Sequence, residues 1–96
     1  MIFAVMEYEK HYSEIHDELV IFVKSKFPNI EYGLQGDSWI WIIENNDKVA
    51  IDTFSSMKHQ IKSSNNEFIL VNKVIDHISS KYKVVVYDTP ELDADE

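Results

Sequence analysis

The residue types required for nucleophilic catalysis occur close together in the middle of the chain. Positions 37–59 contain hydroxyl, carboxylate, ammonium and imidazole groups: Asp37, Ser38, Asp52, Thr53, Ser55, Ser56, Lys58 and His59. A hydroxyl nucleophile, an imidazole base and an orienting carboxylate are the groups of acyl-transfer enzymes. The sequence has no G-x-S-x-G motif, which would place a serine on a sharp strand-to-helix turn. These residues therefore do not by themselves predict an enzyme, and we assign no catalytic residue.

Asp52 stands out because it interrupts the apolar segment 49–54. A carboxylate in such a strand should either face solvent or have a partner. The first interpretation is an ordinary outward-facing residue. The second is a small polar site formed by Asp52, Lys58 and His59.

Metal and cofactor sites are not predicted. The chain has no cysteine, and its four histidines are scattered. His11 and His16 are five residues apart, which puts them on different faces of a helix, unlike the i, i+4 pair of a metal-binding helix. The chain has only two glycines, too few for a glycine-rich phosphate loop.

The segment 38–44 is apolar on both of the faces that a strand would present. One face carries a set that we take as a candidate interaction surface: Trp39, Trp41 and Ile43. The other face carries Ile40 and Ile42. A sheet in a two-layer protein needs an apolar surface on one face only. If the two isoleucines pack beneath helices, the tryptophan face is free for a second copy or another protein, unless the chain itself covers it.

The charge balance limits the partners. The 96 residues include 17 acidic and nine basic side chains, for a net charge of −8, and every basic residue is a lysine. Arginine is the usual ligand of phosphates, so this composition argues against nucleic acids and anionic membranes as partners. Five acids fall in the last nine positions, and we expect 1–88 to be one domain and 89–96 an acidic, flexible tail. The tail's candidate contact residues are Glu91, Asp93, Asp95 and Glu96.

The beginning of the chain has no basic segment followed by a long apolar one, and no apolar stretch approaches the ~20 residues that span a bilayer. We therefore expect a cytoplasmic protein.

Hydrophobic periodicity predicts alternating strands and helices. We expect strands at 2–6, 30–34, 38–44, 49–54 and 83–87, and helices at 11–27 and about 68–82. Ser13 is the expected cap of the first helix, and Ser64 and Glu67 fit a capping box for the second. Residues 55–63 fit either an exposed extra strand or a loop.

This order, strand–helix–strand–strand–strand–(strand)–helix–strand, predicts an α+β two-layer sandwich. The sheet should be mainly antiparallel, with four or five strands and two helices. The first strand, first helix and second strand fit a crossover that would make those two strands parallel.

Three functions remain open. The favoured one is a non-enzymatic protein–protein interaction domain, forming a homodimer through the tryptophan face or an edge strand. The alternative is an immunity-like or DNA-mimicking inhibitor of a basic partner, which requires a continuous acidic stripe such as Glu7, Glu14, Asp17, Glu18 and Glu31. The second alternative is a small enzyme or ligand-binding domain that uses the polar site.

Overall fold

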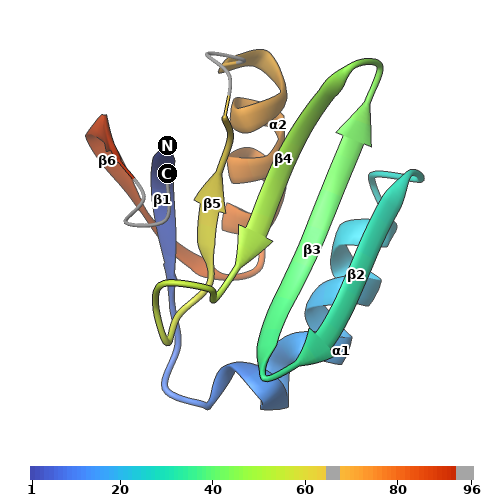
Figure 1. Cartoon of the computed structure of the whole chain (residues 1–96), viewed down its shortest axis with the longest axis vertical. Coiled ribbons are helices and arrows are strands. Elements are labelled where there is room, and N and C mark those ends of the chain that lie inside the picture. The colour runs from blue at the N-terminus through green and yellow to red at the C-terminus, as the bar shows by residue number, and fades with distance from the viewer. Residues whose placement is uncertain (65–67, 93–96) are drawn as a thin grey trace.

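The computed structural model describes residues 1–64 and 68–92. The elements within these residues are β1 (Ile2–Glu7), α1 (Tyr12–Lys24), β2 (Ile30–Gln35), β3 (Asp37–Glu44), β4 (Asp47–Asp52), β5 (Gln60–Lys62), α2 (Phe68–Ser79) and β6 (Lys83–Glu91). The two helices lie on the same side of a single sheet, behind it in Figure 1. The α+β two-layer class is confirmed, with a sheet of six strands in place of the expected four or five.

The strand order is β2-β3-β4-β5-β1-β6, and each neighbouring pair is antiparallel. The pairings make β1 and β2 run in the same direction, as a crossover through α1 requires. They are not neighbours, because β5, β4 and β3 lie between them. The two edges of the sheet are β2 and β6 (Figure 1).

The hydrophobic core lies between the sheet and the helices. Ile40 and Ile42 of β3 are fully buried there, as are Leu19 of α1 and Val74 of α2. Removal of these side chains from water supplies the main free energy that holds the helices on the sheet. The opposite side of β3 must therefore carry Trp39, Trp41 and Ile43 away from the helices.

The cap of α1 differs from the expectation. His11, not Ser13, is the N-cap residue, and its imidazole Nδ1 accepts a hydrogen bond from the Ser13 backbone N–H at 3.2 Å. The Glu14 carboxylate accepts in return from the His11 backbone N–H at 3.0 Å, which completes a capping box. The prediction was wrong because an imidazole nitrogen takes the place of the usual hydroxyl or carboxylate oxygen.

Two strand predictions need correction. Of the two alternatives for segment 55–63, the extra strand is present as β5, but it is buried between β4 and β1 instead of exposed. The last strand does not end at Tyr87, because β6 continues to Glu91, which pairs with Ile2. Pro90 is tolerated there because an edge strand leaves one row of N–H positions unpaired.

Two further expectations fall partly or wholly outside the described residues. The second helix begins at Phe68, and the capping box proposed for it requires Glu67, which is not described. The acidic positions Asp93, Asp95 and Glu96 are likewise not described. Positions 89–91 of the expected tail thus belong to β6, and the flexible tail stays a prediction for 93–96.

Candidate functional site

The three residues of the predicted polar site do not act together. Asp52 ends β4 and its carboxylate pairs with Lys62, whereas Lys58 contacts the Lys10 carbonyl at 3.4 Å. The Lys58 ammonium also lies 4.6 Å from the centre of the Tyr8 ring. His59 is fully buried. The structure thus places these side chains in three different environments.

Asp52 and Lys62 form a buried ion pair on the side of the sheet opposite the helices. The Lys62 ammonium lies 2.8 Å from Asp52 Oδ1, and both side chains are almost completely removed from solvent. Asp52 Oδ1 also accepts a hydrogen bond from the Phe54 backbone N–H at 3.2 Å. The carboxylate that interrupts the apolar strand therefore has a partner on the adjacent strand.

His59 belongs to a chain of buried polar groups beneath the helices. Its Nδ1 is 2.7 Å from the Tyr8 hydroxyl, and its Nε2 is 2.7 Å from Ser38 Oγ. The same serine oxygen lies 2.6 Å from Nδ1 of His16, on α1. The chain Tyr8–His59–Ser38–His16 thus joins the segment that follows β1, the loop before β5, β3 and α1.

The hydrogen bonds of this chain are satisfied with both imidazoles neutral. The Tyr8 oxygen accepts from the His59 backbone N–H at 3.1 Å, so the tyrosine proton is free to point at Nδ1. Nε2–H of His59 then donates to Ser38 Oγ, and the serine proton points at His16. Reversal of all three protons also leaves both rings neutral.

Burial favours the neutral rings. Burial and then the charge of nearby His16 lower the pKa of His59 to about 4. Burial also lowers the pKa of His16, and the Asp17 carboxylate opposes this shift. Burial raises the pKa of the Tyr8 hydroxyl.

This chain contains the groups of a catalytic centre but no access for a substrate. Ser38 and His59 are both 0% exposed, so neither the hydroxyl nor the imidazole meets solvent. The Ser38 backbone is held as well, because its N–H donates to Thr53 Oγ1 and its carbonyl accepts from the Thr53 N–H, both at 3.0 Å. We interpret the chain as a structural network in the core.

Two polar residues on apolar faces of the sequence indicate such a network. His16 directly follows Ile15 on the inward side of the first helix, and Ser38 shares a strand face with Ile40 and Ile42. A polar residue on an apolar face needs a buried partner. The identity of that partner depends on the strand order, which periodicity does not reveal.

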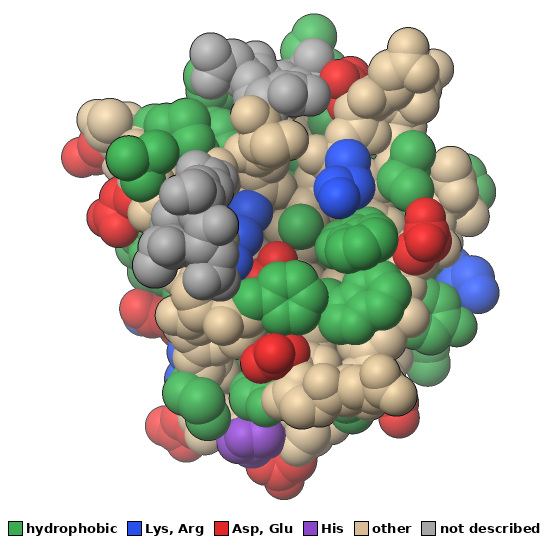
Figure 2. All heavy atoms as spheres, in the orientation of Figure 1, with side chains coloured by type: hydrophobic (Ala, Val, Ile, Leu, Met, Phe, Trp, Pro, Cys, Tyr) green, Lys and Arg blue, Asp and Glu red, His purple; other side chains and the backbone are tan. Residues whose placement is uncertain are grey.

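The candidate functional surface is the side of the sheet that faces away from the helices, here called the open face. Over strands β2 to β5, register and alternation assign to it the side chains of Glu31, Gly33, Gln35, Asp37, Trp39, Trp41, Ile43, Lys48, Ala50, Asp52, Gln60 and Lys62. Val5 and Glu7 of β1 and Lys83 and Val85 of β6 continue this face. Figure 2 looks directly at this face and shows aromatic and aliphatic side chains gathered at its centre. All three residues of the predicted interaction surface lie on it, and each is half-buried.

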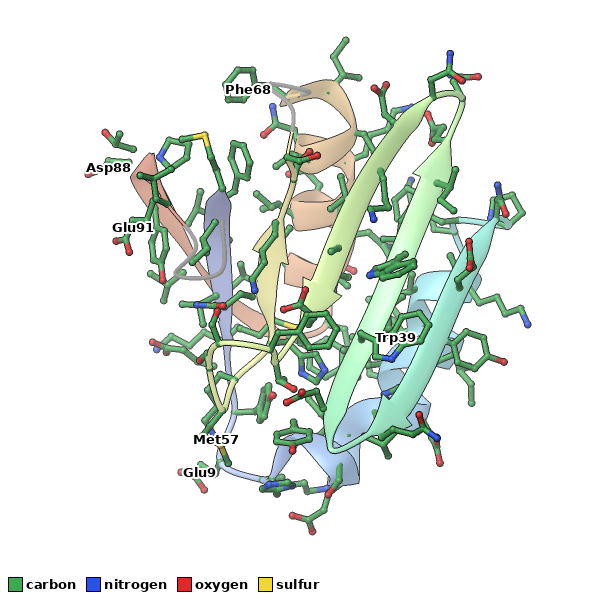
Figure 3. The ribbon with its side chains drawn as sticks, in the orientation of Figure 1. Glu9, Trp39, Met57, Phe68, Asp88 and Glu91 are labelled. Carbon is green, nitrogen blue, oxygen red and sulfur yellow. The ribbon has the colours of Figure 1, made fainter. Side chains whose placement is uncertain are left out.

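The two tryptophans form one aromatic cluster on the open face. Their ring centres are 4.7 Å apart, and the Trp39 ring lies over Gly33 of β2 (Figure 3). A Cβ atom at Gly33 would stand only 2.6 Å from the ring, so the glycine is what allows this close contact. The Lys48 ammonium lies 4.2 Å from the centre of the Trp41 ring, within cation–π range.

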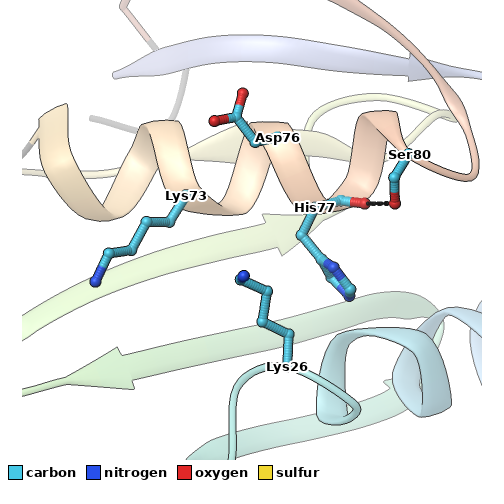
Figure 4. A pocket seen from close by; sticks show the side chains of 5 residues that line it. All are labelled: Lys26, Lys73, Asp76, His77 and Ser80. Carbon is cyan, nitrogen blue, oxygen red and sulfur yellow. Dashed lines mark hydrogen bonds between the residues drawn. The ribbon is translucent and has the colours of Figure 1, made fainter.

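A depression of about 320 Å³ lies on the opposite side of the molecule, between the end of α1 and α2 (Figure 4). Most of its polar groups already have protein partners. Lys73 pairs with Glu44 at 2.8 Å, and His77 donates through Nε2 to the Phe22 carbonyl at 2.7 Å. The Ser80 hydroxyl donates to the His77 carbonyl. Three of the five residues that line this depression are therefore already engaged within the protein.

Comparison with protein-family models, curated proteins and solved structures gives no match. Among the described residues, no three histidine or acidic side chains are grouped in a way that would hold a metal ion. None of the helices in the described part of the chain has the length and apolar character needed to cross a membrane.

Proposed function

We propose that this protein is an interaction domain that forms a homodimer through its open face. One observation carries the proposal: both helices cover one face of the sheet, whereas both tryptophans of the chain lie on the other. Partly exposed tryptophans are the side chains that most often anchor protein interfaces. Clustered apolar surface of this kind marks contact sites more often than single exposed residues do.

The open face is broad, but only part of it is free for a partner. Viewed along its shortest axis, the molecule extends 31 by 28 Å, and this is the view onto the open face. Ile2, Asp52, Gln60 and Lys62 of this face are already buried within the chain, so the free area is centred on the two tryptophans of β3. Standard interfaces bury about 800 Å² on each partner. Two sheets packed face to face would enclose the tryptophans in a second apolar layer.

The charge of the open face favours a second copy as the partner. The open sides of the six strands carry Glu7, Glu31, Asp37, Asp52 and Glu91 against Lys48, Lys62 and Lys83, a balance of −2, whereas the whole chain has −8. Two copies that meet here keep most of their like charges apart.

An acidic inhibitor receives less support from the charge distribution. Glu7 pairs with Lys83 at 3.2 Å, beside one edge of the sheet, whereas Glu31 lies on the other edge strand. These two members of the expected acidic stripe are thus separated by the width of the sheet. Enzymatic use of the polar site receives less support still, because its three residues contact different partners and His59 is fully buried.

The dimer is tested by sedimentation equilibrium over a range of protein concentrations. We expect a mass of twice 11.3 kDa at high concentration, and a red shift in tryptophan emission on dilution, because both tryptophans lie at the interface. A mass of 11.3 kDa at every concentration would overturn the proposal.

Two phenylalanines provide a matched pair of variants. Phe54 is 46% exposed and its ring is 6.0 Å from the Lys62 ammonium of the open face. Phe68 is 50% exposed but lies on α2, in edge contact with Phe3. Phe54→Ala should weaken the dimer, and Phe68→Ala should leave the dissociation constant unchanged. An equal effect of the two substitutions would argue against the open face.

A further inference from the structure

The open face also contains charges that complement each other between two copies. Trp41 of β3 is flanked at the same level by Glu31 on β2 and by Ala50 on β4. Lys48 lies two residues from Ala50 on the same face of β4. An acidic position and a basic position thus stand on opposite sides of the central tryptophan.

Both charges lack an ion-pair partner within the described residues. Glu31 and Lys48 are exposed, whereas three other acids of the sheet have lysine partners at 2.8–3.2 Å. Beside Lys48 the surface has a hollow of about 150 Å³, lined by Lys48, Ala50, Lys62, Ser63 and Ser64. Lys62 pairs with Asp52 and the Ser63 hydroxyl donates to the Lys48 carbonyl, so the Lys48 ammonium is the charged donor that the hollow offers to a carboxylate.

Symmetry decides which groups meet. Homodimer interfaces are usually isologous, with a two-fold axis that exchanges the two copies. An axis parallel to β3 brings β2 of one copy over β4 of the other at an unchanged level along the strands. Glu31 then faces the hollow beside Lys48, twice in each dimer.

On this basis, which rests on the proposed dimer, we infer that the two-fold axis runs along β3 and that Glu31 of each copy pairs with Lys48 of the other. Packed sheets stand about 10 Å apart, a distance that a glutamate and a lysine side chain span together. An axis perpendicular to the strands would instead place Glu31 against Glu31 near the central tryptophans. The chosen axis does bring the Asp37 carboxylates of the two copies toward each other. Asp37 lies four residues from Trp41, at the start of β3, where two packed twisted sheets diverge toward solvent.

The test is a charge exchange between two variants. Lys48→Glu alone and Glu31→Lys alone each create two like-charge contacts in their own homodimer. We expect each to weaken self-association by about tenfold or more. A mixture of the two variants should form a heterodimer of near wild-type affinity, because both of its contacts then join opposite charges. The double variant Glu31→Lys/Lys48→Glu should dimerise with itself. Native mass spectrometry distinguishes these species when one variant carries a mass tag.

Lys26→Glu is the control, because it makes the same charge change on the helix side, at the edge of the depression in Figure 4. We expect it to leave dimerisation unchanged. If the wild type dimerises but the mixed variants do not recover affinity, the predicted pair is wrong and the dimer stands. If the single variants dimerise as well as the wild type, the pair is also wrong. If the wild type is a monomer, both proposals are wrong.

Discussion

A decrease in pH from 7 to 5 should destabilise this protein through a single buried histidine. His59 is fully buried and hydrogen-bonded to Tyr8 and Ser38 as a neutral ring. Its pKa falls from 6.5 in the unfolded chain to about 4 in the fold. Below pH 6.5 the unfolded chain therefore binds a proton that the folded chain does not bind. Stability is highest above pH 6.5 and decreases as the pH falls toward 4.

The magnitude follows from the two pKa values. At pH 5 the unfolded histidine is almost fully protonated and the folded one is mostly neutral, which costs about 2 kcal/mol of unfolding free energy. Below pH 4 the loss reaches about 3 kcal/mol, since each pKa unit corresponds to about 1.4 kcal/mol. The pKa of His16 is lowered in the same direction, which adds to the decrease.

The assay is urea unfolding followed by tryptophan emission at pH 7 and pH 5, at one fixed protein concentration because dimerisation itself contributes to stability. His59→Gln keeps a polar side chain but removes the titrating group. It should be less stable than the wild type at pH 7, yet lose about 2 kcal/mol less between the two pH values. Ser38→Ala is the control: it removes one hydrogen-bond partner but leaves His59 buried, so the pH-dependent loss should remain.

An NMR titration of the His59 ring in the folded wild type provides an independent measurement. The ring should remain neutral until the pH approaches 4. A titration midpoint near 6.5 would refute the reasoning, as would an unchanged pH dependence in His59→Gln.

Two further predictions concern the open face. Gly33→Ala should displace the Trp39 ring, because the new methyl group would stand 2.6 Å from it, and the expected loss of stability is about 1–3 kcal/mol. The shift in tryptophan emission checks this, and an unchanged spectrum would contradict it. Asp52→Asn should cost about 3–5 kcal/mol, because the Lys62 ammonium loses its buried charge partner, whereas Asp52→Leu with Lys62→Met should recover most of that loss. Urea denaturation of both variants compares them, and equal losses would mean that the pair is not the cause.

The two-layer class follows from patterns that each segment carries within itself. Apolar residues at helical spacing in 11–27 and about 68–82 predict two helices with one buried face, and both are present, at 12–24 and 68–79. The run of aromatic and β-branched residues in 38–44 predicts a strand that is apolar on both faces, one of which lies under the helices. Local periodicity is sufficient here because one turn of helix or two residues of strand already establish which side chains share a face.

The strand order is outside the reach of local patterns. β5 has only three residues, two of them Gln60 and Lys62, yet it is buried because β4 and β1 pair with both of its edges. The same pairing brings Lys62 beside Asp52 and so removes Asp52 from the polar site that the sequence indicated. A contact between positions ten residues apart depends on which strands are neighbours, and no spacing rule specifies this.

The core network shows the same limit most clearly. Tyr8, His16, Ser38 and His59 come from four separate segments, and each alone has the appearance of an ordinary polar residue. Their amino-acid types are present in the sequence, but the buried chain exists only because the sheet order and the position of α1 bring them together. The spacing of two residues thus determined that Trp39 and Trp41 would share one face of a strand. The packing of both helices on the other side decided that no helix covers this face. A helix can cover either face of a sheet with similar burial, so only the complete set of tertiary contacts selects one.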